Sequence, residues 1–271
     1  MQQTTGQERP PPRLATPPSA PEAPDELAQR GDALRPGVLT GVSGGGRSER
    51  SAFLAILSHE LRTPITTIYA GSRVLARSGG TSVQGSQEIA AAISAEAASL
   101  YDVVEDLLVL ARDEAGVLDL SDEPVHLQRI VEGAIRIAES RAPSVPVVFA
   151  GSEDPPAVRG DAVYVEQVVR NLIVGSLRFA GPDRPVTVSL RAGKHNVILC
   201  VGDRGPNLTE DDLAAGFDLL DEPTGPRRSR FGIGLFVCRR LVEAMRGRIS
   251  MTRRSGGGAE FLVALPRYAT D

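Results

Sequence analysis

Apolar residues recur at helical spacing from about residue 49 onward. The first stripe advances in steps of three and four residues through Leu54, Leu57, Leu61, Ile65, Ile68 and Leu75, with Ser72 in the slot between the last two. A second stripe of similar period contains Ile89, Ile93, Leu100, Val103, Leu107 and Leu110. Two long amphipathic helices joined by a short, glycine-rich connection predict an antiparallel hairpin. Because a lone hairpin buries only one face of each helix, the stripes predict pairing with a second copy into a four-helix bundle.

The pattern changes after residue 116, where helical and strand-like segments are mixed. Helices are predicted at 125–142, at 160–180 with an N-cap near Asp161, and at 231–247. Strands are predicted at 145–151, as a pair within 186–205, and as a closing hairpin formed by 248–255 and 256–266. This order predicts an α+β layer in which helices cover one face of a sheet.

The first 48 residues have a different composition from the rest of the chain. Eight of the 20 prolines lie before residue 37, and "GVSGGGRSER" closes the segment. Each proline removes an N–H donor and fixes φ, so a packed element cannot use so many. We therefore predict a disordered tail at 1–48, a helical hairpin at 49–116 and an α+β domain at 117–271.

Composition and charge narrow the classes of function. The hydrophobic content of 41% is ordinary for a globular protein, and the net charge of −4 indicates neither nucleic acid nor an anionic membrane as a partner. No segment approaches the ~18 uninterrupted apolar residues of a membrane span, and the N-terminus does not resemble a signal peptide. We expect a cytoplasmic protein without a transmembrane segment. Cys200 and Cys238 lie inside apolar runs and are expected to be buried thiols.

His59 is one of only three histidines in the chain. It lies two positions from both Leu57 and Leu61, about 200° around a helix, so it should point away from the apolar stripe. An exposed neutral imidazole is a usable nucleophile, and the adjacent Glu60 could accept the proton on Nδ1. Thr63 follows one turn later on the same face. The residues alone fit an ordinary polar helix face equally well.

Two glycine pairs indicate a site for phosphate. Asp203 and Gly205 follow a strand in "VGDRGPN", and Gly232 and Gly234 open a helix in "FGIGL". Glycine at a helix start lets backbone N–H groups approach phosphate oxygens. Neither pair matches a Walker A loop or a dinucleotide fingerprint, and each alone also fits a simple turn. The polar stretch between them, 208–230, is predicted to be a mobile lid.

Five blocks in order give these observations a common explanation. "SHELRTP", "VVRNLIVGSLRFA", "DRGPN", "FGIGL" and "GGGAEF" resemble the H, N, first glycine, second glycine and final glycine-rich boxes of sensor histidine kinases. The resemblance covers about residues 49 to 267. It implies a hairpin that dimerises and displays the phosphorylated histidine. It also implies a Bergerat-type α/β sandwich that binds ATP, as in other GHKL ATPases.

The resemblance also implies residue roles. His59 matches the phosphorylated residue, Glu60 its general base, and Thr63 the position that orients water for dephosphorylating the partner regulator. Asp203 matches the acceptor of the adenine amino group. The other positions matched to nucleotide binding are Asn171, Arg178, Gly205, Gly232 and Gly234, of which Asn171 is also matched to Mg²⁺ ligation.

The implied activity is an ATP- and Mg²⁺-dependent autokinase. It would phosphorylate His59 and pass the phosphoryl group to an aspartate in the receiver domain of a response regulator. The implied assembly is a homodimer. Nothing before residue 49 is long enough for a folded sensor, so we expect either that a separate sensor protein delivers the stimulus or that the Pro-rich tail docks a partner. Two positions depart from the family pattern, because Gly175 replaces a second asparagine and Asn207 replaces a glycine. These departures leave open a degenerate kinase that acts as a regulator phosphatase or as a dimeric scaffold.

Overall fold

The computed structural model describes residues 47–77, 82–151, 155–181, 183–218 and 232–269. All of these residues belong to one unit, Thr40–Asp271. The predicted tail at 1–48 lies outside the described residues except for its last two positions. The predicted lid at 208–230 is described only as far as residue 218.

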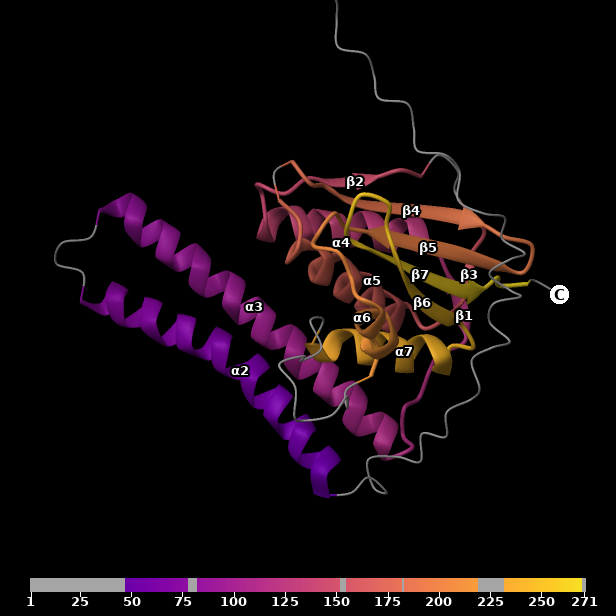
Figure 1. The fold of residues 1–271 in the computed structure, drawn as a ribbon, viewed down its shortest axis with the longest axis horizontal. Coiled ribbons are helices and arrows are strands. Elements are labelled where there is room, and N and C mark those ends of the chain that lie inside the picture. The colour runs from indigo at the N-terminus through magenta and orange to yellow at the C-terminus, as the bar shows by residue number, and fades with distance from the viewer. Residues whose placement is uncertain (1–46, 78–81, 152–154, 182, 219–231, 270–271) are drawn as a thin grey trace, which may run out of the picture. The chain divides into compact units, whose positions relative to one another are not determined.

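Two long helices form the predicted hairpin (Figure 1). They are α2 (Arg47–Ala76) and α3 (Val83–Glu114), and they pack side by side. Ser82 caps α3, because its side chain accepts a hydrogen bond of 3.1 Å from the Gly85 N–H. None of the described helices is both long and apolar enough to cross a membrane.

A five-stranded sheet forms the centre of the α+β part. Its order is β2–β4–β5–β7–β6, in which β2 is parallel to β4 and the other pairs are antiparallel. Its strands are β2 (Val147–Phe149), β4 (Val186–Ala192), β5 (Asn196–Gly202), β6 (Arg248–Arg253) and β7 (Ala259–Pro266). Two short strands, β1 (Glu123–Val125) and β3 (Val158–Gly160), pair separately. Gly202 lies opposite Glu260, which brings the end of β5 beside the start of β7.

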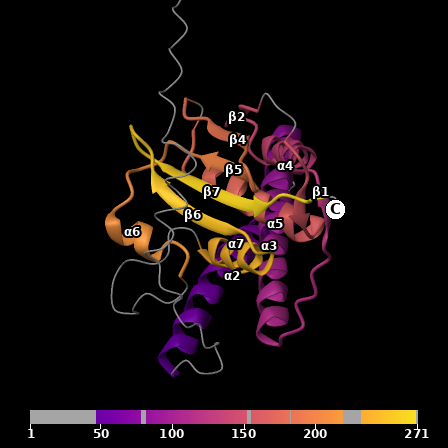
Figure 2. The same cartoon turned by 90° about the vertical axis from the view of Figure 1, so that its right-hand side faces the viewer.

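Helices cover one side of this sheet, as Figures 1 and 2 show. They are α4 (Leu127–Arg141), α5 (Ala162–Leu177) and α7 (Gly232–Ala244), and a short α6 (Glu210–Ala215) follows β5. The core between them includes Leu172, Leu241 and Phe261, each at most 2% exposed. Val109 and Leu110 of α3 belong to the same core cluster. The α+β prediction is therefore confirmed, and the core extends onto the C-terminal part of the hairpin.

Both cysteines are buried, as predicted. Burial raises the pKa of each thiol above its usual value, and for Cys238 the rise is large. A low-pKa thiolate is required for a reactive cysteine, so these two side chains act as small apolar core residues.

Asp161 is the N-cap of α5, as the sequence predicted. Its side chain accepts hydrogen bonds from the N–H groups of Val163 and Tyr164, and its other oxygen accepts from Ser121. We expect Asp161→Ala to lower the free energy of unfolding by about 1–2 kcal/mol, because the first turn of α5 loses its acceptor. Urea denaturation measures this. Asp161→Asn keeps a capping oxygen and should recover most of the loss; an alanine variant as stable as the parent would contradict the assignment.

Candidate functional site

His59 is exposed on α2, as its position off the apolar stripe predicted. Its side chain is 54% exposed, and its Nδ1 lies 3.6 Å from Glu60 Oε1. Thr63 stands one turn later and donates from Oγ1 to the His59 carbonyl oxygen at 3.4 Å. A carboxylate on the Nδ1 side leaves Nε2 as the nitrogen available for attack.

Asp203 stands at the end of β5 and is only 2% exposed. Its Oδ1 accepts hydrogen bonds from the N–H groups of Gly205, at 2.7 Å, and Ala259, at 3.3 Å. Its buried Oδ2 has no hydrogen-bond partner among the described residues. Buried polar atoms normally have partners, so this oxygen fits a ligand donor such as the amino group of adenine.

The glycine turn before β7 approaches the backbone of Asp203 closely. Gly256, Gly257 and Gly258 all have positive φ, between 89° and 100°. A Cβ at Gly258 would overlap the carbonyl oxygen of Asp203. The sequence identified this turn only as a glycine-rich box. The close approach of this turn lets the start of β7 reach Asp203, and the Ala259 N–H donates to Asp203 Oδ1.

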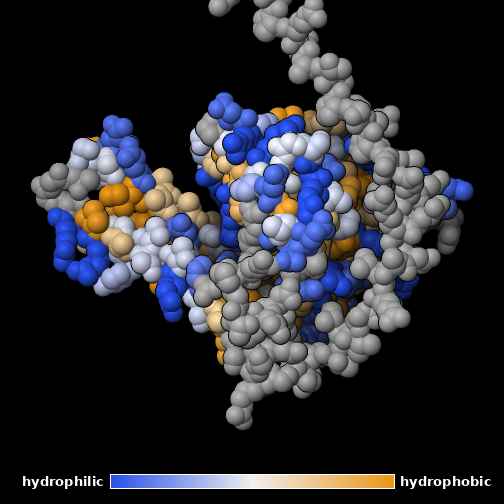
Figure 3. Space-filling model, in the orientation of Figure 1, coloured by the Kyte–Doolittle hydropathy of each residue, from blue (hydrophilic) through white to orange (hydrophobic). Residues whose placement is uncertain are grey.

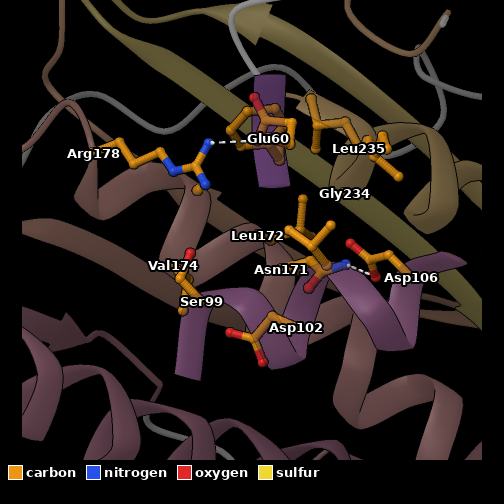
Figure 4. A pocket seen from close by; sticks show the side chains of 14 residues that line it. Glu60, Ser99, Asp102, Asp106, Asn171, Leu172, Val174, Arg178, Gly234 and Leu235 are labelled. Atoms are coloured by element: carbon orange, nitrogen blue, oxygen red, sulfur yellow. Dashed lines mark hydrogen bonds and ion pairs between the residues drawn. The ribbon is translucent and has the colours of Figure 1, made fainter. Parts of the chain in front are cut away.

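The N-terminus of α7 forms an anion subsite with Arg178. Gly232 opens the helix with φ 65°, and a Cβ there would lie 3.0 Å from Glu60 Oε2. The same Glu60 oxygen lies 3.8 Å from Arg178 Nη1 (Figure 4). A helix N-terminus and a guanidinium both attract negative charge, so the subsite that holds the Glu60 carboxylate also suits phosphate oxygens.

Asn171 on α5 contacts a buried carboxylate that sequence analysis missed. Its Nδ2 donates to Asp106 Oδ1 at 2.8 Å, and Gln167 donates to the same oxygen at 2.8 Å. Burial raises the pKa of Asp106 to about 6, against the two amide hydrogen bonds, which lower it. One signal was present: Asp106 lies on the apolar stripe of the second helix, three residues after Val103 and four before Leu110.

One pocket brings several of the predicted residues together. The residues that line it include Glu60, Asp106, Asn171, Gly175, Arg178 and Gly234 (Figure 4). His59, Thr63, Asp203, Gly205 and Gly232 are not among the lining residues. The pocket therefore brings together Glu60, Asn171, Arg178 and Gly234 of the predicted set, while Asp203 is not among its lining residues.

The donor set of this pocket is compatible with Mg²⁺. No group of three or more His, Cys, Asp or Glu side chains among the described residues could hold a metal. Mg²⁺ does not require such a cage, because it keeps several waters and uses one or two protein ligands together with substrate phosphates. Asn171 offers an amide oxygen beside the anion subsite. A Cβ at Gly175 would meet nothing within 4 Å, so this position adds space and no ligand.

Two family models match separate parts of the chain. Residues 49–116 match the His Kinase A (phospho-acceptor) domain, and residues 160–269 match the histidine kinase-, DNA gyrase B-, and HSP90-like ATPase. Together they cover more than half of the chain. The chain belongs to the sensor histidine kinase family. This agrees with the resemblance carried by the five sequence blocks, and with an exposed histidine followed by an α+β sandwich.

Named relatives support the same family. The chain is 31% identical over 227 residues to the sensor protein TorS of Escherichia coli, covering 82% of the chain and 24% of TorS. It is 29% identical over 221 residues to the sensor protein KdpD of Escherichia coli, covering 80% of the chain and 24% of KdpD. The probable sensor histidine kinase TcrY of Mycobacterium tuberculosis is 30% identical over 217 residues, with 79% and 45% covered. The chain thus spans less than half of each relative.

A solved structure shares the fold. The histidine kinase AdeS of Acinetobacter baumannii superimposes with a TM-score of 0.55 at 25% sequence identity. The superposition covers 78% of this chain and 98% of that structure. Both the hairpin and the ATPase-like domain therefore have counterparts in a histidine kinase of known structure.

Proposed function

We propose that the chain is an ATP-dependent autokinase that phosphorylates His59 and passes the phosphoryl group to an aspartate of a response regulator receiver domain. The observation that carries this proposal is the buried Oδ2 of Asp203, which has no partner among the described residues, together with the exposed His59 on α2. More than half of the His59 side chain is exposed, so both a nucleotide and a receiver aspartate can reach it.

Nucleotide binding is assigned to three regions of the ATPase-like domain. Asp203 accepts a hydrogen bond from the adenine amino group. The Gly205 N–H holds the Asp203 carboxylate in place, and glycine at this position adds no side chain to the turn. Arg178 and the backbone of Gly232 and Gly234 hold the phosphates at the start of α7. Asn171 binds Mg²⁺. When bound, the Mg²⁺ nucleotide supplies the phosphoryl group and neutralises the charge that develops on it.

His59 acts as the nucleophile. Its Nε2 attacks the γ-phosphorus, so a nitrogen–phosphorus bond forms while the bond to the leaving ADP oxygen breaks. Glu60 takes the Nδ1 proton, which restores a neutral phosphorylated imidazole. Thr63 orients water when the partner regulator is dephosphorylated. Because ATP is the donor, we place the protein in the cytoplasm.

Glu60 should govern the rate of phosphorylation more than nucleotide affinity. We expect Glu60→Gln to slow phosphorylation of His59 by about 100-fold or more, because the proton on Nδ1 loses its acceptor. Nucleotide should bind at least as tightly, since a carboxylate has left the anion subsite. Single-turnover labelling and a nucleotide titration measure the two quantities. Glu88→Gln, an exposed glutamate on α3, is the matched control, and a parental rate in Glu60→Gln would remove Glu60 from the mechanism.

The hairpin has an exposed apolar face that supports a homodimer. Hydrophobic side chains are exposed along it in Figure 3. The exposed large hydrophobic side chains of α2 and α3 include Leu54, Ile65, Tyr69, Tyr101, Val104 and Leu108, each between 41% and 61% exposed. On α3 they follow each other at three- and four-residue steps. Such a stripe matches the seam of a four-helix bundle, in which a second copy would cover it.

Leu108 offers a direct test of the dimer. We expect Leu108→Lys to shift the protein from dimer to monomer, because the charge would be buried in the bundle seam. Analytical ultracentrifugation measures the mass. Val163→Lys changes a 70% exposed apolar residue at the start of α5 and should leave the dimer intact. A Leu108→Lys variant that stays dimeric would place the interface elsewhere.

The reaction itself is tested with γ-labelled ATP and Mg²⁺. The expected product is a label that is stable to base and labile to acid, as for a phosphorylated histidine. A label with the opposite stability would indicate a hydroxyl acceptor and contradict the proposal.

A further inference from the structure

Asn171 is the only amide side chain among the described residues that line the pocket beside α7. One turn later, α5 presents Gly175, which has no side-chain oxygen and faces open space. The proposed function assigns Mg²⁺ to this one amide oxygen. An amide has two nearly isosteric ends, and only the oxygen end can ligate a cation.

Asp106 determines which end of this amide faces the pocket. The Asn171 nitrogen donates to Asp106 Oδ1 at 2.8 Å, and Figure 4 shows the amide oxygen on the other side. A carboxylate accepts hydrogen bonds and donates none, so the reversed amide would place two oxygens against each other. Gln167 donates to the same Oδ1 and holds the carboxylate in place. Asp106 is 5% exposed, so water competes little for these contacts.

We propose that Asp106 of α3 is a positioning residue for the nucleotide's Mg²⁺, and that it acts by holding the Asn171 amide with its oxygen toward the pocket. This inference rests on the proposed function. It assigns a role in the ATP site to the helical hairpin, since Asp106 lies outside the residues matched by the ATPase family model. Partners behind a metal ligand commonly change metal affinity when they are removed.

Ion pairs elsewhere on the face of α3 that carries Asp106 join the hairpin to the ATPase-like domain. Asp102, one turn before it, pairs with Arg141 of α4 and with Arg170 of α5. Asp113, two turns after it, pairs with Arg240 of α7 at 2.6 Å. These pairs dock α3 on the ATPase-like domain without touching Asn171. They provide the control that separates docking of the hairpin from orientation of the amide.

The test compares nucleotide affinity with and without metal. A fluorescent, non-hydrolysable ATP analogue is titrated in EDTA and again in Mg²⁺, and the ratio of the two dissociation constants gives the metal contribution. We expect Asp106→Leu to reduce this ratio by about tenfold or more while the EDTA value changes little. Asp106→Asn keeps the shape and one acceptor oxygen, so its ratio should fall less. It also serves as the readout if the leucine variant does not fold.

Asp113→Asn is the matched control, because it weakens docking and leaves Asp106 with Asn171. Its ratio should equal that of the parent. Gly175→Asn adds a second amide oxygen in open space, so it should restore the ratio when it is combined with Asp106→Leu. Equal losses with and without metal, an equal loss in Asp113→Asn, or no rescue by Gly175→Asn would overturn the proposal.

These outcomes are separate from those that test the kinase. If His59 takes label but Asp106→Leu leaves the ratio of dissociation constants unchanged, only the positioning role is contradicted. If Asp106→Leu lowers the ratio but no label is incorporated, only the kinase activity is contradicted.

Discussion

Asp203→Asn should weaken ATP binding by about 100-fold, because the adenine amino group loses a charged acceptor and instead faces the N–H groups of the new amide. The oxygen of the new amide would stay with the N–H groups of Gly205 and Ala259, which hold Oδ1 in the parent. The amide nitrogen would then replace the buried Oδ2. The position that we assign to the adenine amino group would meet a donor.

Isothermal titration of the Asp203→Asn variant with ATP measures this loss. Asp122→Asn is a suitable control, because Asp122 is an exposed carboxylate paired with Arg159 on the surface. Both variants should melt near the parental temperature without nucleotide, since the hydrogen bonds of Oδ1 survive in the first and the second lies outside the core. Parental affinity in Asp203→Asn would show that the adenine does not lie at this carboxylate.

Much of the fold follows from patterns within single segments. The three- and four-residue steps of apolar residues predicted α2 and α3, and the residues just before α5 predicted its Asp161 cap. The angular step of a helix predicted that the His59 side chain points away from the apolar stripe. These features depend on contacts between near neighbours in the chain, which a sequence displays directly. The three-residue strands β1 and β3 were missed, because neither lies in an apolar run such as "VPVVF", which revealed the equally short β2.

The contacts that complete the site join distant segments. Asp106 and Asn171 are 65 positions apart, and the sequence offered only a carboxylate on an apolar stripe as a sign. Glu60 reaches the start of α7 through docking of the whole hairpin, which no local pattern encodes. The glycine turn before β7 was recognised as a box, but its close approach to Asp203 depends on the pairing of β5 with β7. Tertiary packing determines each of these contacts.

His59 is the residue on which the proposed activity depends most. Glutamine there keeps a polar side chain on the exposed face of α2, but it has no imidazole nitrogen to form a bond to phosphorus. His59 does not line the pocket beside α7, so nucleotide should bind the variant as well as the parent. Loss of label with retained nucleotide binding in His59→Gln would therefore identify His59 as the phosphoryl acceptor and not as part of the ATP site.

The most direct measurement is incorporation of γ-label into the parent and into three variants, His59→Gln, His126→Gln and His195→Gln, which together cover every histidine in the chain. We expect acid-labile label in the parent and in the last two variants, and none in His59→Gln. Label that persists without His59, or a parent that binds ATP and takes no label at any Mg²⁺ or Mn²⁺ concentration, would contradict this expectation.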